Sequence, residues 1–201
     1  MKLIHISGPW PLCTNTFLVL TDAGHAVAVD PAASAESYTK ALAENNAQLT
    51  HIFLTHGHYD HVGAVEALAA QTGAAVYIDP ADQQGSQMFP LKPGMDCHPW
   101  PQSGELQVDE LTFRIWHTPG HSQGSVCIAC GGLLFSGDTL FAGSCGRVDL
   151  PGGSPAQMQQ SLSMVASLPL PDETQVLPGH EGFSTLGQER KSNPYLLGDW
   201  Y

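Results

Sequence analysis

The chain has 201 residues, of which 42% are hydrophobic, and its 19 acidic residues outnumber 7 basic ones to give a formal net charge of −12. Affinity for nucleic acids comes largely from Lys and Arg side chains that neutralise phosphates, so this balance argues against DNA or RNA as a partner. A chain of this length can bury roughly 70% of the surface that it exposes when unfolded. We therefore expect residues 1–201 to form a single domain that needs no disulfide for stability.

The first ten residues hold no apolar stretch long enough for a signal peptide, and no segment approaches the roughly 18 consecutive apolar residues of a membrane span. We expect a cytoplasmic protein with no membrane partner; the sequence does not indicate its oligomeric state. The five cysteines are scattered and odd in number, which predicts reduced thiols. Cys127 and Cys130 have the spacing of a redox or zinc motif, but within a strand they would face opposite sides.

Short strands alternate with a few helices along the chain. Strand character is found at 17–20, 26–29, 52–54, 75–78, 111–116, 126–129 and 133–135. The spacing of apolar residues predicts three helices. The first has Ser34 as N-cap and ends near Asn45, the second runs from Val62 to Gly73, and the third follows the N-cap Ser154.

This order of elements predicts an α/β architecture in which helices cover sheets. Residues 24–30 and 132–138 repeat one pattern, a glycine, a short apolar strand and a final aspartate, which indicates two related halves. The stretch 89–102 is rich in Pro and Gly and is predicted to be a long surface loop.

A dense group of possible metal ligands follows the strand that ends at Leu54. Residues 56–61 read His-Gly-His-Tyr-Asp-His and place His56, His58, Asp60 and His61 within one turn. Alternation along the turn lets the first two imidazoles face one way while the aspartate and the last imidazole serve a neighbouring position. Two adjacent metal sites are therefore expected, rather than one.

Three later residues complete this set. His121 and His180 each follow Pro-Gly at the end of an apolar segment, and Asp138 closes the strand 133–137. Each would be unremarkable alone, but a proline-glycine turn can direct a side chain into a cleft. An aspartate at the end of a strand could bridge two cations with its two oxygens.

Taken in order, His-x-His-x-Asp-His, Pro-Gly-His, Gly-Asp-Thr and Pro-Gly-His resemble the metallo-β-lactamase superfamily over nearly the whole chain. The resemblance implies an αββα four-layer sandwich with two divalent metal ions at one edge between the sheets. It also implies a first site of His56, His58 and His121, a second site of Asp60, His61 and His180, and a bridge by Asp138. Asp60 is in addition the candidate catalytic residue.

Imidazole and carboxylate ligands suit Zn, Fe or Mn better than Ca or Mg, and we expect Zn, with Fe or Mn as alternatives. Two such ions can share a water, lower its pKa from about 15.7 toward neutrality and use it as the nucleophile. A cysteine nucleophile is then unnecessary, and Cys145 is not assigned that role.

Within the superfamily, residues 137–147 resemble the glyoxalase II branch, whose members hydrolyse glutathione thioesters such as S-lactoylglutathione. A thiol with a pKa of about 8.5 leaves without help from a general acid. The chain ends 21 residues after His180, so it resembles short glyoxalase II-like proteins without the helical domain that grips glutathione. We predict a hydrolase of small thioesters, hydroxyacylglutathione first among them, with Arg147 and Cys145 as substrate-binding residues.

Other functions remain as alternatives. Persulfide dioxygenases share the Cys-Gly-Arg-x-Asp loop and use one iron and oxygen, although the Pro-Gly-His at His180 and the complete second site favour hydrolysis. A metallo-hydrolase of another substrate, or a metal-binding scaffold without activity, is also considered. The absence of an export signal disfavours a β-lactamase, and the acidic balance disfavours a nuclease.

Overall fold

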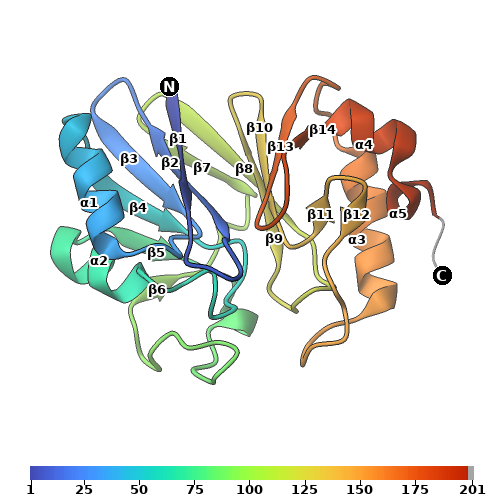
Figure 1. The fold of residues 1–201 in the computed structure, drawn as a ribbon, viewed down its shortest axis with the longest axis horizontal. Helices are drawn as coiled ribbons and strands as arrows, with labels where there is room; N and C mark the ends of the chain where they lie inside the picture. Colours follow the sequence, from blue (N-terminus) through green and yellow to red (C-terminus); the bar gives the residue numbers. More distant parts are fainter. Residues whose placement is uncertain (199–201) are drawn as a thin grey trace.

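The computed structural model describes residues 1–198 and has four layers, with helices on the outer faces of two sheets that pack against each other (Figure 1). Three buried apolar clusters separate these layers: one under α1 and α2, one between the sheets, and one under α3. The αββα sandwich expected from the sequence is therefore confirmed.

The first sheet is built from the N-terminal half of the chain. Its order follows the sequence: β1 (Lys2–Ser7), β2 (Asn15–Leu20), β3 (His25–Val29), β4 (Gln48–Phe53), β5 (Ala75–Tyr77) and β6 (Cys97–His98). β1, β2 and β3 are antiparallel neighbours, whereas β3 to β6 run parallel. The parallel strands end at a common edge, from which the loop that follows β4 emerges.

The second sheet comes from the C-terminal half. Its order is β14 (Ser184–Thr185), β13 (Gln175–Pro178), β10 (Leu133–Gly137), β9 (Val126–Cys130), β8 (Leu111–His117) and β7 (Glu105–Val108). Only β10 and β13 are parallel to each other, and both end at the edge that carries the site. A small hairpin of β11 (Leu140–Phe141) and β12 (Ser144–Cys145) follows β10.

The helices lie on the outside of the two sheets. They are α1 (Ala35–Glu44), α2 (Val65–Thr72), a 3₁₀ turn η1 (Pro80–Asp82), α3 (Pro155–Ser167), α4 (Leu186–Ser192) and α5 (Pro194–Leu197). The predicted N-caps of α1 and α3 are confirmed, since Ser34 and Ser154 accept hydrogen bonds from the backbone of the first turn. No helix within residues 1–198 is both long and apolar enough to cross a membrane.

Strands in the interior are apolar on both faces because each face meets a different layer. In β2, Phe17 and Val19 enter the core between the sheets, whereas Leu18 and Leu20 enter the core beneath α1 and α2. β8 alternates instead between buried and exposed positions, since its outer face is partly open to solvent. The inner strands are therefore apolar throughout because their alternate residues enter two different cores.

Two elements differ from the sequence prediction. α2 begins at Val65 rather than Val62, because the backbone N–H of Ala64 donates to the carbonyl of Pro31 and holds this turn against the end of β3. The stretch 89–102 is not wholly loop, because Cys97 and His98 form β6 at the edge of the first sheet. A two-residue strand is too short for apolar spacing to reveal it.

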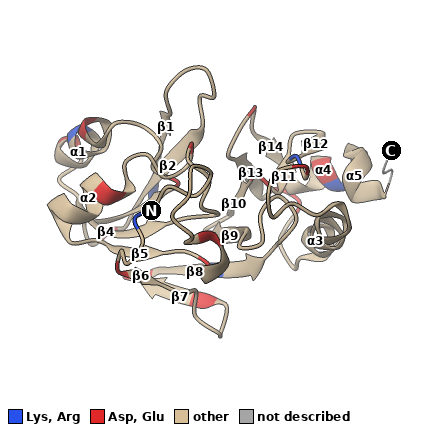
Figure 2. Ribbon diagram, turned by 90° about the horizontal axis from the view of Figure 1, so that it is seen from below, with Lys and Arg blue, Asp and Glu red and all other residues tan. Residues whose placement is uncertain are grey.

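Charged residues are distributed unevenly between the two signs. Acidic positions are spread along strands, helices and loops, whereas the basic positions are few and scattered along the ribbon (Figure 2). Basic positions therefore do not gather in one segment of the described chain.

We expect Gly120→Ala to lower the free energy of unfolding by about 1–3 kcal/mol, the usual cost of overpacking. Gly120 has φ +145°, and an added Cβ would lie 2.5 Å from the backbone N and Cα of Met158 in α3. Urea unfolding followed by circular dichroism measures the loss. Gly182→Ala, where an added Cβ would meet nothing within 4 Å, is the matched control. Equal stability of the two variants would contradict this close contact.

Candidate metal centre

The seven predicted ligands come from separate segments that meet at one edge of the sandwich. Residues 56–61 follow β4, His121 lies between β8 and β9, and Asp138 and His180 follow β10 and β13. Five of the seven side chains are buried, and Asp60 and His180 are partly exposed. The arrangement forms a polar cluster with access to solvent from one side.

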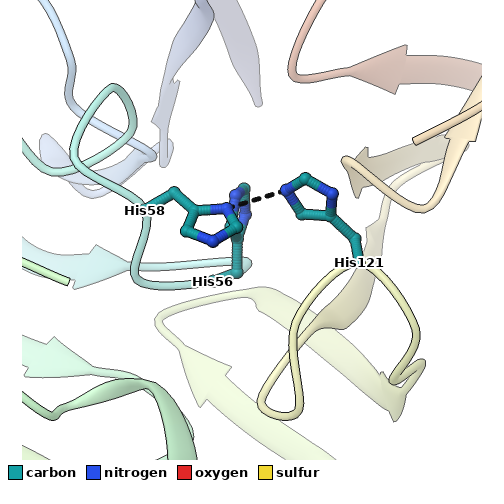
Figure 3. A group of neighbouring side chains, drawn as sticks. All are labelled: His56, His58 and His121. Carbon is teal, nitrogen blue, oxygen red and sulfur yellow. Dashed lines mark hydrogen bonds between the residues drawn. The ribbon is translucent and has the colours of Figure 1, made fainter. Parts of the chain in front are cut away.

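The first predicted triad is close together in the structure. One ligand atom from each of His56, His58 and His121 lies within 4.8 Å of the others. The nearest approach is 2.8 Å, between Nδ1 of His58 and Nε2 of His121. Figure 3 shows the three rings turned toward a common point, two from the loop after β4 and one from the facing loop of the other sheet.

The second predicted triad lies beside the first. Nε2 of His180 is 3.1 Å from Oδ2 of Asp60 and 3.4 Å from Nε2 of His61. Nε2 of His61 lies 3.8 Å from the same oxygen of Asp60. Two nitrogens and one carboxylate oxygen thus face one another in a group that could hold a second cation.

Asp138 lies between the two triads. Its Oδ1 is 3.4 Å from Nε2 of His61, whereas its Oδ2 is 3.4 Å from Nε2 of His121 and 3.5 Å from Nε2 of His180. Each carboxylate oxygen therefore faces imidazole nitrogens, and Oδ2 faces both triads. This is the geometry that a bridging carboxylate requires.

Four of the imidazoles are oriented by hydrogen bonds on their outer side. Two of them bind side chains: Nδ1 of His56 lies 3.1 Å from Oγ1 of Thr55, and Nδ1 of His61 lies 3.0 Å from Oδ2 of Asp30. The other two bind main-chain carbonyls: Nδ1 of His121 lies 2.8 Å from the carbonyl of Arg147, and Nδ1 of His180 lies 3.3 Å from that of Leu12. When Nδ1–H donates outward, the lone pair of Nε2 points into the cluster. Metal-binding histidines show this pattern.

A further observation indicates that these residues can bind a divalent cation. Nε2 of His56 and Oδ1 of Asp138 are buried and have no hydrogen-bond partner. Buried polar atoms without partners are costly, and a bound metal ion would satisfy both atoms. Burial lowers the pKa of His56 and brings the pKa of His58 to about 4, so both imidazoles are neutral at pH 7 as ligands must be.

Two opposing effects set the pKa of Asp138. Burial alone would raise its pKa, but the neighbouring His61, His121 and His180 outweigh burial and hold the pKa of this carboxyl well below its usual range. A buried carboxylate that stays ionised favours positive charge next to its oxygens, and its charge in turn raises the pKa of His61 and His180. The electrostatics of the cluster therefore agree with its donor atoms.

Asp30 is a functional residue that the site prediction missed. Its side chain is 2% exposed and accepts hydrogen bonds from the backbone N–H of Thr55 at 2.7 Å, from Oγ1 of Thr55 at 2.6 Å and from Nδ1 of His61 at 3.0 Å. Asp30 thus orients His61 directly and His56 through Thr55. The repeated glycine-strand-aspartate pattern was a signal, because it relates Asp30 to Asp138.

Asp82 was also missed. This carboxylate, 1% exposed at the end of η1, accepts from the backbone N–H of Gly57 at 3.1 Å, from that of Gly124 at 2.8 Å and from Oγ of Ser122 at 2.6 Å. It therefore joins the loop that carries the first imidazoles to the loop that carries His121. A single aspartate in a loop gives no sequence signal of this kind.

Asn15 fixes the segment around His180. Its Nδ2 donates to the carbonyls of Pro178 at 3.1 Å and Glu181 at 3.0 Å, and its backbone N–H donates to that of Gly179 at 2.7 Å. The first strand pair thereby holds a ligand that comes from the other sheet. No local pattern marks Asn15, since these contacts join residues more than 160 positions apart.

The hairpin β11–β12 is held by the C-terminal helices. Asn193 and Glu189 are both fully buried. Nδ2 of Asn193 donates to the carbonyls of Phe141 at 3.2 Å and Ser144 at 3.0 Å, and Oε2 of Glu189 accepts from the N–H of Gly143 at 2.8 Å. The position of this hairpin therefore depends on α4 and on the turn into α5.

Cys145 and Arg147, the two predicted substrate residues, line a cavity of about 380 Å³ together with five of the seven predicted ligands. Burial raises the pKa of Cys145 to about 11, so its thiol is protonated at neutral pH. The guanidinium of Arg147 contacts both oxygens of Asp149, at 2.7 and 2.8 Å. The structure thus places both residues at the site, and their contact with substrate stays a prediction.

Comparisons with known proteins agree with this geometry. Residues 10–180 match the model of the metallo-β-lactamase superfamily. The chain is 34% identical over 202 residues to hydroxyacylglutathione hydrolase GloC of Haemophilus influenzae, with 90% of this chain and 92% of the relative covered. It is 40% identical over 168 residues to hydroxyacylglutathione hydrolase of Salmonella dublin, covering 83% of this chain but only 62% of that longer relative.

Several solved structures are similar to this chain in sequence and fold. The B3 metallo-β-lactamase BLEG-1 is 33% identical with a TM-score of 0.86, covering 98% of this chain and 100% of that one. ETHE1 from Myxococcus xanthus is 31% identical with a TM-score of 0.81, over 98% and 85% of the two chains. TTHA1623, crystallised in a di-iron-bound form, is 35% identical with a TM-score of 0.79, over 96% and 99%.

Elemental analysis of the purified protein should find about two metal ions per chain, and one or fewer in Asp138→Ala. The reason is that Asp138 faces imidazoles of both triads, so its removal takes an oxygen donor from each proposed site. His98→Ala, which removes an exposed imidazole outside the cluster, is the control and should keep the wild-type content. Unchanged metal content in Asp138→Ala would exclude a bridging role.

Asp30→Asn should weaken metal binding by about 10–100-fold, the usual effect of removing a group that orients a ligand. The amide cannot accept hydrogen bonds with both of its terminal atoms, so the orientation of His56 and His61 is lost. Competition with a chromophoric chelator measures the affinity, and circular dichroism verifies the fold. Asp96→Asn, at an exposed position, serves as the matched variant. Equal affinities would show that Asp30 has only a structural role.

Proposed function

The chain belongs to the metallo-β-lactamase superfamily, and we propose that it is a metal-dependent hydrolase of small acyl thioesters. The observation that carries the proposal is the convergence of the two triads around Asp138. Asp60, His180 and Asp138 line the cavity of about 380 Å³, so the cluster is open to a small substrate.

We propose that His56, His58 and His121 hold one divalent ion, that Asp60, His61 and His180 hold a second, and that Asp138 bridges them. When bound, such ions activate a water molecule and polarise the carbonyl of the substrate. Zn is the first expectation; Fe or Mn would suit the same donors, and the di-iron form of TTHA1623 shows that one similar protein can bind iron.

Asp60 is the proposed catalytic carboxylate. Asp60 lines the cavity, with its Oδ2 3.1 Å from Nε2 of His180 and 3.5 Å from Oγ1 of Thr14. Oδ2 is the oxygen that would bind the second ion, so the other carboxylate oxygen, Oδ1, would orient the attacking water and accept its proton. Cys145 has no part in this step, because its thiol remains protonated at neutral pH.

A thioester suits a site with this composition. Among the described residues that line the cavity, apart from the proposed ligands, the ionisable side chains are Tyr59, Cys145, Arg147 and Glu181. A thiolate leaves readily because the pKa of a thiol is about 8.5, whereas an amide would need a general acid to protonate its nitrogen. The names of two relatives point to the same chemistry, and hydroxyacylglutathione is therefore the first thioester to test.

The alternative is a mononuclear iron dioxygenase that acts on glutathione persulfide. It is favoured by the likeness to ETHE1 from Myxococcus xanthus and by the Cys-Gly-Arg-x-Asp sequence at 145–149. The second triad argues for hydrolysis, since a mononuclear site would not need Asp60, His61 and His180 together. Dependence on oxygen separates the two.

Purified protein should hydrolyse S-lactoylglutathione at equal rates with and without oxygen. Chelation should abolish the activity, and His58→Ala should lower kcat/KM by about 100-fold or more, because loss of a ligand is at least as severe as loss of a group that orients one. Cys145→Ser should keep kcat within a few-fold of wild type. Oxygen uptake with glutathione persulfide and about one iron per chain would instead establish the dioxygenase.

A further inference from the structure

We infer that the site prefers thioesters of thiols that carry no carboxylate over those of glutathione, and that the apolar part of the substrate is held by a trough lined by Trp10, Leu12 and Tyr59. The inference rests on the proposed function and refines its substrate class. It would distinguish this chain from an enzyme that recognises its substrate through the two carboxylates of glutathione.

The trough is formed by two adjoining cavities. The cavity of about 380 Å³ over the metal cluster shares Leu12, Tyr59 and Asp60 with a second cavity of about 350 Å³. The walls of the second cavity include Pro9, Trp10 and other residues of the loop between β1 and β2. A substrate whose carbonyl lies at Asp60 can therefore extend from one cavity into the other.

The trough is apolar to a degree that is unusual for this surface. Six large hydrophobic side chains are exposed among the described residues, and three of them, Trp10 at 86%, Leu12 at 42% and Tyr59 at 49%, line the trough. Apolar residues that gather around a polar cluster indicate a ligand-binding surface rather than chance exposure. Removing the apolar part of a ligand from water at this surface would favour binding.

Apart from the proposed metal ions, positive charge is nearly absent from the trough. Arg147 is the one Lys or Arg among the described residues that line either cavity, and its guanidinium already contacts both oxygens of Asp149. Lys92, Arg114 and Arg190 are paired with acidic residues elsewhere.

A carboxylate on the thiol half of the substrate, placed in the second cavity away from the proposed metal ions, would therefore lose water without gaining a free cation. Such loss is costly, and Glu181 at the rim of the cavity would add repulsion, as would the net charge of −12. An uncharged thiol half avoids these costs. The composition of the trough thus selects against glutathione and for a neutral apolar group.

Two variants can test this without disturbing the metal ligands. Leu12 and Arg147 hold His180 and His121 through their backbone carbonyls only, so Arg147→Gln leaves the hydrogen bond to His121 in place. Trp10 is exposed, and truncation to alanine should not affect folding. Leu197→Ala, an exposed apolar residue that lines neither cavity, is the matched control.

The experiment is isothermal titration of the metal-loaded protein with two thioethers that cannot be hydrolysed, S-hexylglutathione and S-hexyl-N-acetylcysteamine. We expect the uncharged thioether to bind more tightly than the glutathione derivative. Trp10→Ala should weaken binding of both by about tenfold, within the usual effect of losing an apolar contact. Leu197→Ala should change either Kd by less than about twofold. Arg147→Gln should do the same because its guanidinium is held by Asp149, a result that would go against the predicted contact of Arg147 with substrate.

Equal or tighter binding of S-hexylglutathione would overturn the inference, as would equal binding by Trp10→Ala and wild type. Binding does not require turnover, so these outcomes are separate from the proposed function. That proposal is tested by hydrolysis of the lactoyl thioesters of the same two thiols. Failure of both to be hydrolysed would reject the thioesterase, while the binding results would still decide whether the trough prefers an uncharged group.

Discussion

The ionised carboxylate of Asp138 is the constraint on which the site depends. It is buried, and its charge is balanced only if His61, His121 and His180 approach it from three other segments. Those segments belong to both sheets, so the carboxylate is surrounded by its histidines only when the two halves of the molecule pack correctly against each other. An error in the packing of the sheets would leave a charge without partners in the interior, which is among the costliest faults that a fold can contain.

The second feature of the site is that its orienting groups come from a distance. Asn15 in the first sheet holds the turn around His180, and Asp82 joins the two loops that carry His58 and His121. Asp30, which follows β3, orients His61 directly and His56 through Thr55. The polar cluster therefore acts as part of the contact between the sheets, in addition to the apolar core that separates them. Loops at the ends of strands carry the predicted ligands, and side chains distant in the sequence set their angles.

The fold and the candidate ligands could be predicted from the sequence, and the residues that could not be predicted were missed for physical reasons. The dense turn at 56–61 and two Pro-Gly-His turns predicted the ligands because chemistry and turn geometry are both local there. The resemblance that they support gave the four-layer fold, which is confirmed. Asn15, Asp82, Glu189 and Asn193 could not be found in this way, because each acts through contacts with residues distant in the sequence. The start of α2 was misplaced since Val62 continues the apolar spacing into a turn whose backbone bonds elsewhere.

The use of main-chain carbonyls to orient His121 and His180 has a consequence for the history of the protein. The carbonyl of residue 12 or residue 147 is present whatever side chain that position bears. Mutations at these positions can therefore alter what the site accepts while the imidazoles remain in place. Selection for a new substrate and selection for an intact metal centre act on different atoms of the same residues, and such a separation makes a scaffold easy to diversify.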